Sequence, residues 1–250
     1  MRKKLSVVVS CYNEELALWQ FYKETSQVLK SLPWDYELIF VNDGSQDGSL
    51  DILNQLADED ERVKVIAFSR NFGHEAAMIA GLDYSSGDGI VCMDADLQHP
   101  PECIPSIVEA FQEGYHVINM VRTKNESAGK FKNFASSSFY RLINVLSDVK
   151  FEPNASDFFG ISRKASKVLK DHYREKVRFL RGYVQNIGFK RKNIEYEARS
   201  RVAGESKYSI KKLITFSVNT IMCFSNLPLK LGIYAGAIAA ILGLAVMIYT

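Results

Sequence analysis

Cysteine is scarce in this chain, and its few cysteines have neither metal-binding nor redox spacing. The four residues, Cys11, Cys92, Cys103 and Cys223, form no CxxC pair within the 250 residues. This argues against a zinc ribbon or a disulfide-stapled scaffold. Cys11 and Cys92 lie in or beside strongly apolar segments, so we expect them to be small core residues in a reducing compartment.

The net charge is small, and no signal peptide is expected. The formal charge of +2 gives no support for a nucleic-acid partner, and none is expected. Basic residues cluster only late in the chain, where 190–212 holds eight Lys or Arg against three Glu. The charged start, Met1–Lys4, precedes only six mostly apolar residues. That run is too short for a signal peptide, so we expect the body of the chain to be cytoplasmic.

Short apolar segments alternate with amphipathic ones over the first half of the chain. The expected strands are Leu5–Ser10, Tyr36–Val41, Val63–Phe68, Gly89–Met93 and His116–Val121. The expected helices are Glu15–Leu32, Gly48–Asp58, His74–Ser85 and Ile104–Gln112, with Ser45 and Asp47 as N-cap candidates and Pro100-Pro101 delaying the last. Nearly continuous apolar strands are typical of parallel sheets covered on both faces. The pattern predicts a doubly wound α/β sheet.

The second half of the chain has a less regular pattern that ends in an apolar run. Residues 190–208 are polar and basic and are interpreted as a mobile loop, the last part of a catalytic domain spanning 1–208. An amphipathic helix at the membrane surface is expected over 209–229. Leu231–Tyr249 has nineteen residues without a charge, enough to span a bilayer, and Lys211, Lys212 and Lys230 precede it. A buried helix of a soluble protein is the alternative.

Polar clusters follow four consecutive expected strands, where open α/β sheets bind ligands. They are Tyr12-Asn13-Glu14, Asn42-Asp43-Gly44-Ser45, Arg70-Asn71-Phe72-Gly73 and Asp94-Ala95-Asp96. Asp94 and Asp96 can both reach one hard cation, Mg²⁺ or Mn²⁺, that bridges a diphosphate. A solvated acidic turn is the alternative for this pair. Asp43 can accept hydrogen bonds from a base or ribose. Glu14 suits either a nucleoside or a helix N-terminus, and Arg70 either a phosphate or the open surface.

Six segments together resemble family-2 inverting glycosyltransferases of GT-A fold, in the polyprenyl-phosphate branch that includes dolichol-phosphate mannose synthases and bactoprenol glucosyltransferases. The segments are VVVSCYNEE (Val7–Glu15), FVNDGSQDGS (Phe40–Ser49), SRNFGHEAAMIAGL (Ser69–Leu82), MDADLQHPPE (Met93–Glu102), ASDFFGISR (Ala155–Arg163) and RVAGESKYS (Arg201–Ser209). Two departures are a missing proline in the first segment and His99 in the fourth. His99 is expected to be a neutral loop residue and not a metal ligand.

The resemblance implies a role for each matching residue. The nucleotide would contact Tyr12, Asn13, Glu14, Asp43, Arg70 and Asp94, and the metal would be organised by Asp94, Asp96 and Gln98. Asp157 stands where the family places its catalytic carboxylate, with a turn residue as the alternative. Candidates for binding the acceptor phosphate are Arg122, Lys130, Lys132, Ser136, Arg201 and Lys207, each of which has the alternative of being a surface residue.

The implied reaction is the transfer of a hexose, glucose favoured, from a UDP-sugar to undecaprenyl-type phosphate at the cytoplasmic membrane face. Mg²⁺ or Mn²⁺ is the implied cofactor, membrane lipid an implied partner, and a homo-oligomer one option for assembly. A phosphate monoester is already largely dianionic at neutral pH, so Asp157 is expected to orient groups as much as to remove a proton. A GDP-mannose-dependent synthase and a non-catalytic nucleotide-sugar-binding protein are the two alternatives.

Overall fold

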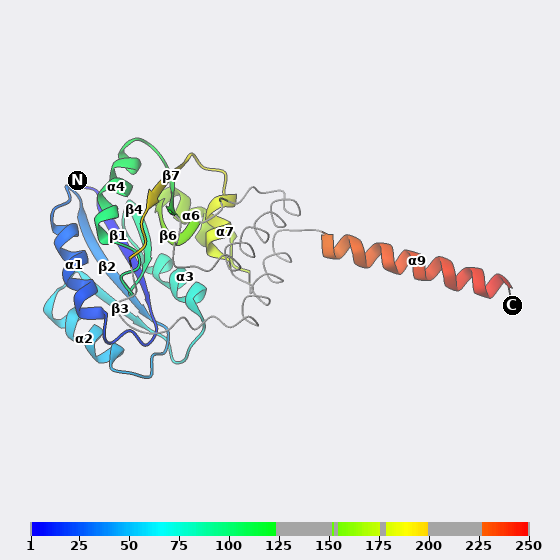
Figure 1. Cartoon of the computed structure of the whole chain (residues 1–250), viewed down its shortest axis with the longest axis horizontal. Coiled ribbons are helices and arrows are strands. Elements are labelled where there is room, and N and C mark those ends of the chain that lie inside the picture. The colour runs from blue at the N-terminus through cyan, green and yellow to red at the C-terminus, as the bar shows by residue number, and fades with distance from the viewer. Residues whose placement is uncertain (1, 124–151, 153–154, 176–178, 200–226, 250) are drawn as a thin grey trace. The chain divides into compact units, whose positions relative to one another are not determined.

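The residues described by the computed structural model are 2–123, 152, 155–175, 179–199 and 227–249 (Figure 1). They belong to two units, one comprising Met1–Ser127 with Glu152–Ser206 and the other Ala128–Phe151 with Lys207–Thr250. In the second unit the described part is the helix α9, Leu227–Tyr249. The expected helix over 209–229 lies almost entirely outside the described residues.

A seven-stranded sheet forms the first unit, in the order β3-β2-β1-β4-β6-β5-β7. Its strands are β1 Lys4–Cys11, β2 Asp35–Asn42, β3 Val63–Ala67, β4 Gly89–Asp94, β5 Val117–Arg122, β6 Ala155–Ser162 and β7 Arg191–Tyr196. The neighbours β3, β2, β1 and β4 are parallel, as the apolar runs predicted. Only β6 is antiparallel, to both β4 and β5, so the α/β sheet is mixed.

Helices cover both faces of this sheet, as expected for a doubly wound fold (Figure 1). On one face α1, α2 and α4 pack beside the short 3-10 helix η1, and on the other α3, α6 and α7 pack together. Their bounds are α1 Leu18–Lys30, α2 Ser49–Glu59, α3 His74–Tyr84, η1 Pro101–Cys103, α4 Ile104–Gln112, α6 Arg163–His172 and α7 Leu180–Asn186. Strand β1 is buried from both sides, because Val7 and Val9 join the core with α1 while Val8 faces Gly81 of α3.

Several expected boundaries need correction. The segment expected to be a mobile loop over 190–208 contains strand β7, which pairs in parallel with β5. The first helix begins at Leu18, not Glu15. The N-cap of α2 is Gly48, so neither Ser45 nor Asp47 takes that position, although Asp47 accepts the Ser49 amide at 3.0 Å. Cys11 and Cys92 are buried, as expected.

The direction of β6 decides which residues share an edge of the sheet. Strands β1 to β4 are parallel, so their carboxyl ends lie at one edge. Because β6 runs the opposite way beside β4, with Gly89 opposite Ser162 and Cys92 opposite Phe159, its start lies where β4 ends. Asp157 is the third residue of β6. It therefore lies at the edge of the sheet that also holds Asp94.

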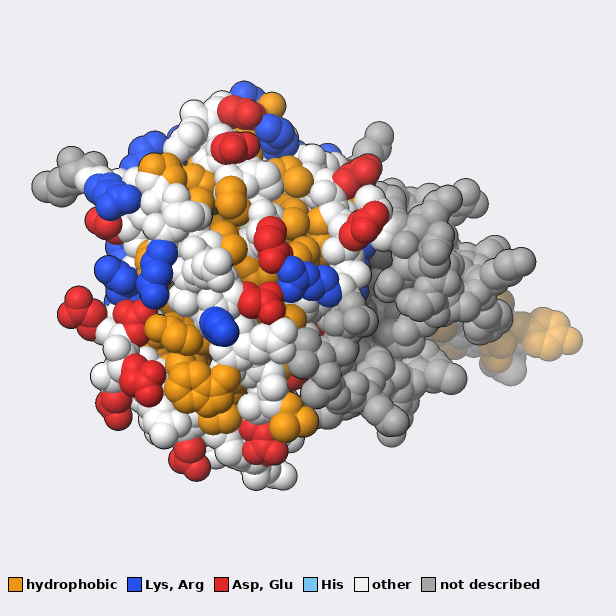
Figure 2. All heavy atoms as spheres, turned by 60° about the vertical axis from the view of Figure 1, so that its left-hand side comes forward, with side chains coloured by type: hydrophobic (Ala, Val, Ile, Leu, Met, Phe, Trp, Pro, Cys, Tyr) orange, Lys and Arg blue, Asp and Glu red, His pale blue; other side chains and the backbone are white. Residues whose placement is uncertain are grey.

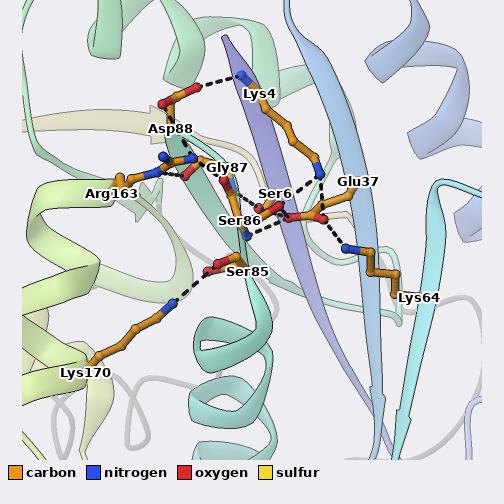
Figure 3. Close-up of polar contacts among 10 residues, drawn as sticks. All are labelled: Lys4, Ser6, Glu37, Lys64, Ser85, Ser86, Gly87, Asp88, Arg163 and Lys170. Carbon is orange, nitrogen blue, oxygen red and sulfur yellow. Dashed lines mark hydrogen bonds and ion pairs between the residues drawn. The ribbon is translucent and has the colours of Figure 1, made fainter.

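A buried carboxylate ties the strands together at the opposite, amino-terminal edge (Figure 3). The Glu37 side chain is only 2% exposed and accepts hydrogen bonds from Lys64 at 2.6 Å, Lys4 at 2.9 Å and Ser6 at 2.5 Å. It also accepts the Ser86 amide at 2.8 Å. Burial alone would raise the pKa of Glu37, but these donors outweigh it and hold the pKa well below its usual range.

The surface on the side of α1 and α2 carries charges of both signs. Figure 2 shows Lys and Arg side chains interspersed with Asp and Glu across this face, with hydrophobic side chains between them. The most exposed large apolar residues of α1 and the turn before it are Leu16 and Trp19. On this face, basic side chains therefore do not form the continuous patch that a nucleic-acid partner requires.

Helix α9 has the length and composition of a membrane span. Its segment Leu229–Tyr249 has a mean hydropathy of 2.3, and no part of this segment is buried among the described residues. The exposed apolar side chains include Leu231, Ile238 and Ile248. The predicted helix over 231–249 is confirmed, and it begins earlier, at Leu227. Its length is sufficient, because about twenty apolar residues cross a bilayer as a helix.

We predict that Glu37→Gln lowers the free energy of unfolding by about 1–3 kcal/mol at pH 7, because Lys4 and Lys64 lose their buried anion. The folded pKa of Glu37 lies below the unfolded value of about 4.3. Its stabilisation is therefore complete above that pH and is lost as pH falls toward the folded pKa. Chemical denaturation in detergent at pH 7 and pH 4 should show the gap between variant and wild type narrowing in acid.

Glu113→Gln is the matched control for this measurement. Glu113 pairs with Lys192 at 2.6 Å, but the two side chains are 51% and 35% exposed. Such a pair contributes at most about 0.5–1 kcal/mol. Equal losses in the two variants would contradict a stabilising role for the Glu37 cluster.

Candidate functional site

Asp94 lies at the centre of a polar cluster at the carboxyl edge of the sheet. It ends β4 directly opposite Ser10 of β1, whose hydroxyl lies 3.2 Å from Asp94 Oδ1. His74, the first residue of α3, places Nδ1 2.8 Å from the Ser10 hydroxyl and 3.4 Å from Asp94 Oδ1. The Asp94 side chain remains 30% exposed. It can therefore still reach a ligand from solvent.

The loop after Asp94 is tightly built and locally strained. Asp96 is buried, and its Oδ1 accepts the Gln98 amide at 3.0 Å. Leu97, between them, is a buried residue with φ of 61°, in the left-handed region that side chains other than glycine rarely adopt. Backbone strain of this kind costs about 1–3 kcal/mol and concentrates at binding and catalytic sites. The two aspartates are thus held in a fixed local geometry.

His99 connects this loop to strand β5. Its ring is fully buried and stacks on Phe158 at 5.2 Å. Nδ1 faces the Asp94 amide at 3.0 Å, and Nε2 faces Nη2 of Arg122 at 3.2 Å. Burial lowers the pKa of His99, and the charge of Arg122 lowers it further. The neutral state expected for this residue is therefore favoured, in a buried position that the sequence did not reveal.

Asp157 lies across the site from Asp94. Its Oδ2 is 4.0 Å from Nε2 of His74, and its Oδ1 is 3.8 Å from Nε of Arg181, near the start of α7. Burial would raise the pKa of Asp157, but the charges of Arg181 and His74 outweigh it and lower that pKa. Asp157 therefore remains an anion near neutral pH.

Glu75 adds a further carboxylate that the sequence reasoning did not single out. It follows His74 in α3 and accepts the Leu180 amide at 2.8 Å. Burial, and then repulsion from Asp157, raise the pKa of Glu75 to about 7. For His74, burial lowers the pKa, but Asp94 and Asp157 act the other way and the net shift is upward. Asp94, Asp157 and Glu75 thus bring three carboxylates around His74 at this edge.

Asp43 is occupied with holding a neighbouring loop. It is buried, and its oxygens accept the amides of Phe72 at 2.7 Å and Gly73 at 2.9 Å. Gly44, with φ of 67°, lies against the backbone of Arg70, where a Cβ atom would collide. A carboxylate has about four acceptor positions, so contact with a nucleoside stays a prediction for Asp43.

The other residues expected at the nucleotide lie in the same group of loops. Asn13, with φ of 57°, accepts the Gln46 amide at 2.8 Å and so joins the loops after β1 and β2. The Glu14 amide donates to Ser49 at 2.9 Å. Arg70 is exposed and its guanidinium stacks 4.1 Å from the centre of the Phe72 ring. Tyr12, which precedes Asn13 in the chain, is partly buried. Their roles toward a nucleotide stay predictions.

Of the expected acceptor-binding residues, only Arg122 lies within the described part of the chain. It ends β5, and its Nε donates to the Tyr196 hydroxyl at 2.9 Å. The remaining five lie outside the described residues, and these are Lys130, Lys132, Ser136, Arg201 and Lys207. Just before the last two, Arg199 pairs with Glu24 at 2.7 Å and Glu102 at 2.5 Å, and its amide donates to Gln98 at 3.3 Å. Arg199 therefore lies beside the loop that holds Asp96 and Gln98.

The carboxylate oxygens of Asp94 and Asp96 suit a hard cation that is shared with a substrate. No group of three or more His, Cys, Asp or Glu with metal-binding geometry occurs among residues the structure describes. Asp94 and Asp96 nevertheless end one strand and begin the next loop, and Mg²⁺ is often held by one or two carboxylates plus substrate phosphates. The negative charges of Asp94 and Asp157 on either side of His74 favour a cation here.

Comparison with known proteins places these observations in a family context. The family model described as glycosyl transferase family 2 matches residues 6–169. The glycosyltransferase YkcC of Bacillus subtilis (strain 168) is 45% identical over 231 residues, which cover 92% of this chain and 71% of the relative. The bactoprenol glucosyl transferase of Shigella phage SfV is 37% identical over 237 residues, covering 95% of this chain and 77% of the relative.

A solved structure supports the same fold. Glucosyl-3-phosphoglycerate synthase from Mycobacterium tuberculosis, crystallised with Mn²⁺, uridine diphosphate and phosphoglyceric acid, superposes with a TM-score of 0.62 at 20% identity. The match covers 88% of this chain and 76% of that protein. At this identity the likeness establishes the fold alone.

We predict that Glu75→Gln flattens the decline of stability between pH 5 and pH 8. The pKa of Glu75 is raised to about 7 in the folded protein, against about 4.3 when unfolded. Stability is therefore lost as pH rises between these two values. Because glutamine keeps an acceptor for Leu180 without the charge, the variant should be more stable than wild type at pH 8 by up to about 2–3 kcal/mol. Denaturation at both pH values measures the difference, with exposed Glu59→Gln as control. A constant offset between wild type and Glu75→Gln at both pH values would contradict the prediction.

Proposed function

Because the chain belongs to glycosyl transferase family 2, we propose that it transfers a hexose, with inversion, from a nucleoside diphosphate sugar to a polyisoprenyl phosphate. UDP-glucose is the favoured donor. The relative named bactoprenol glucosyl transferase supports both the sugar and the lipid acceptor. This fold is compatible with that nucleotide, since a fold neighbour of 20% identity was crystallised with Mn²⁺ and uridine diphosphate.

One observation carries this proposal, namely that Asp94 and Asp157 meet at the carboxyl edge of the sheet on either side of His74. The donor would bind on the Asp94 side and the acceptor phosphate would approach from the Asp157 side. An oxygen of that phosphate attacks the anomeric carbon and forms a new carbon–oxygen bond. The bond to the nucleoside diphosphate breaks, and both electrons leave with that group.

Asp94 and Asp96, with the Gln98 side chain as an additional candidate, would hold a divalent cation shared with the donor diphosphate. When bound, Mg²⁺ or Mn²⁺ supplies Lewis-acid stabilisation of the leaving phosphate. The chain itself contributes a fixed loop, because Asp96 accepts the Gln98 amide and Leu97 has a left-handed backbone. This preorganisation lowers the cost of ordering the ligands when the donor binds.

Asp157 is better suited to orient the acceptor than to remove a proton. The charges of Arg181 and His74 lower its pKa, which makes it a weak base near neutral pH. A phosphate monoester has its second pKa near 6 and is already mostly dianionic. We therefore assign to Asp157 the alignment of Arg181 and the incoming phosphate, with a smaller catalytic contribution than a full general base of about 10²–10⁴-fold.

Helix α9 would keep the protein at the membrane that holds the lipid acceptor. Helix α9 has the composition of a bilayer span. The basic residues Arg201 and Lys207 precede it in sequence, where they would bind the acceptor phosphate at the cytoplasmic surface. Arg122 is a further candidate, held by Tyr196 at the end of β5.

The experiment that tests the proposal measures transfer to polyprenyl phosphate from a panel of donors. Purified protein in detergent is incubated with UDP-glucose, other UDP-hexoses or GDP-mannose, with Mn²⁺ or with chelator. Metal-dependent glucosyl lipid from UDP-glucose is the expected product. Efficient transfer from GDP-mannose alone would contradict the favoured donor, and donor binding without transfer from any sugar would contradict the enzyme.

We predict that Arg201→Ala lowers acceptor-dependent efficiency about ten- to a hundredfold while UDP affinity stays within about twofold, because one charged hydrogen bond is worth roughly 1.5–3 kcal/mol. Lys192→Ala is the matched control, since Lys192 pairs with Glu113 on the exposed surface. Kinetics at low and high salt separate specific binding from attraction to anionic lipid. Equal, salt-suppressed losses in both variants would remove Arg201 from the site.

A further inference from the structure

His74 contacts the ends of three strands at the centre of the proposed site. Nδ1 lies 2.8 Å from the Ser10 hydroxyl of β1 and 3.4 Å from Oδ1 of Asp94 in β4. Nε2 lies 4.0 Å from Oδ2 of Asp157 in β6. The imidazole thus lies within 4.0 Å of both carboxylates. Its contact with Asp94 is close, whereas that with Asp157 is too long for a direct hydrogen bond.

We infer that His74 is a positioning residue that sets the orientation of Asp94 relative to Asp157. This inference rests on the glycosyl transfer proposed above, and it assigns His74 a role through the two carboxylates and not through contact with the reacting atoms. Two carboxylates on adjacent strands repel each other and would turn apart toward solvent if nothing lay between them. The imidazole lies between them, with Nδ1 facing Asp94 and Nε2 facing Asp157.

The backbone that presents His74 is fixed independently of the ring. Gly73 precedes it with φ of 98°, a left-handed conformation that suits glycine. The amide of Gly73 donates to Asp43 at 2.9 Å, and the preceding amide of Phe72 donates to the other oxygen of Asp43 at 2.7 Å. A buried carboxylate in the loop directly after β2 therefore fixes where α3 begins. Because that start is anchored, the ring can hold a constant position between Asp94 and Asp157.

The two ring nitrogens can be tested separately by amide substitutions. In His74→Asn the shorter amide reaches the position of Nδ1, beside Ser10 and Asp94, and leaves the Asp157 side open. In His74→Gln the longer amide reaches toward the position of Nε2 and weakens the Ser10 side. His74→Ala removes both contacts.

His116→Ala is the matched control. His116 also places Nδ1 beside a serine hydroxyl, at 2.9 Å from Ser162, but it precedes β5 at the opposite edge of the sheet. Both alanine variants remove one histidine–serine contact. Thermal unfolding of each variant therefore shows how much of any loss is structural.

The experiment combines calorimetry of UDP with Mn²⁺ and steady-state transfer to polyprenyl phosphate. We expect His74→Ala to lose about tenfold or more in kcat and several-fold in UDP affinity, with an unfolding temperature close to that of His116→Ala. His74→Asn should restore UDP affinity to within about threefold of wild type and leave kcat low. His74→Gln should show weaker UDP affinity than His74→Asn. Wild-type kinetics in all four variants, or equal losses in His74→Ala and His116→Ala, would overturn the inference.

The design separates this inference from the function on which it rests. If wild-type protein binds UDP with Mn²⁺ but transfers nothing to polyprenyl phosphate, the proposed acceptor is wrong. The ratio of UDP affinities between His74→Asn and His74→Ala still tests the link to Asp94 in that case. Absence of both UDP binding and transfer in the wild type would overturn the proposed function and the inference together.

Discussion

The constraint on which the site depends is the crowding of carboxylates at one edge of a sheet. Asp94 and Asp157 meet there because β6 runs against β4, and Glu75 follows at the start of α3. Burial, and then repulsion from Asp157, raise the pKa of Glu75 to about 7, even with Arg181 nearby. Clustered carboxylates with shifted pKa values are typical of binding and catalytic sites, where their repulsion is offset by a function. We propose that these carboxylates provide oxygen ligands for a cation and hold Arg181 toward the acceptor phosphate.

Much of this architecture could be predicted because it follows from local patterns. Apolar runs identified β1 to β5 within one or two residues, and the polar turns after the first four mark the edge where ligands bind. The motifs indicated family 2, which the family model and the relatives confirm. Asp94 and Asp157 came from motif matches, and the structure brings them to one site.

The rest depended on pairing between distant segments, which local patterns do not encode. Strand β7 was missed because it is an edge strand whose charged side chains, such as Arg191, remain exposed and weaken the apolar signal. The antiparallel direction of β6 follows from its neighbours and not from its own residues. His74 and Glu75 begin a helix, where polar residues are ordinary. Only the packing of α3 against β1 and α7 shows that they border Asp94 and Asp157.

The central claim is that the excess negative charge at this edge serves a cation shared with a nucleoside diphosphate. The most direct test is anomalous diffraction from crystals grown with Mn²⁺ and UDP. We predict an anomalous peak within direct coordination distance of a carboxylate oxygen of Asp94 or Asp96, bridged to the UDP phosphates. Ordered UDP with a manganese peak remote from both aspartates, or with no peak at all, would contradict the account.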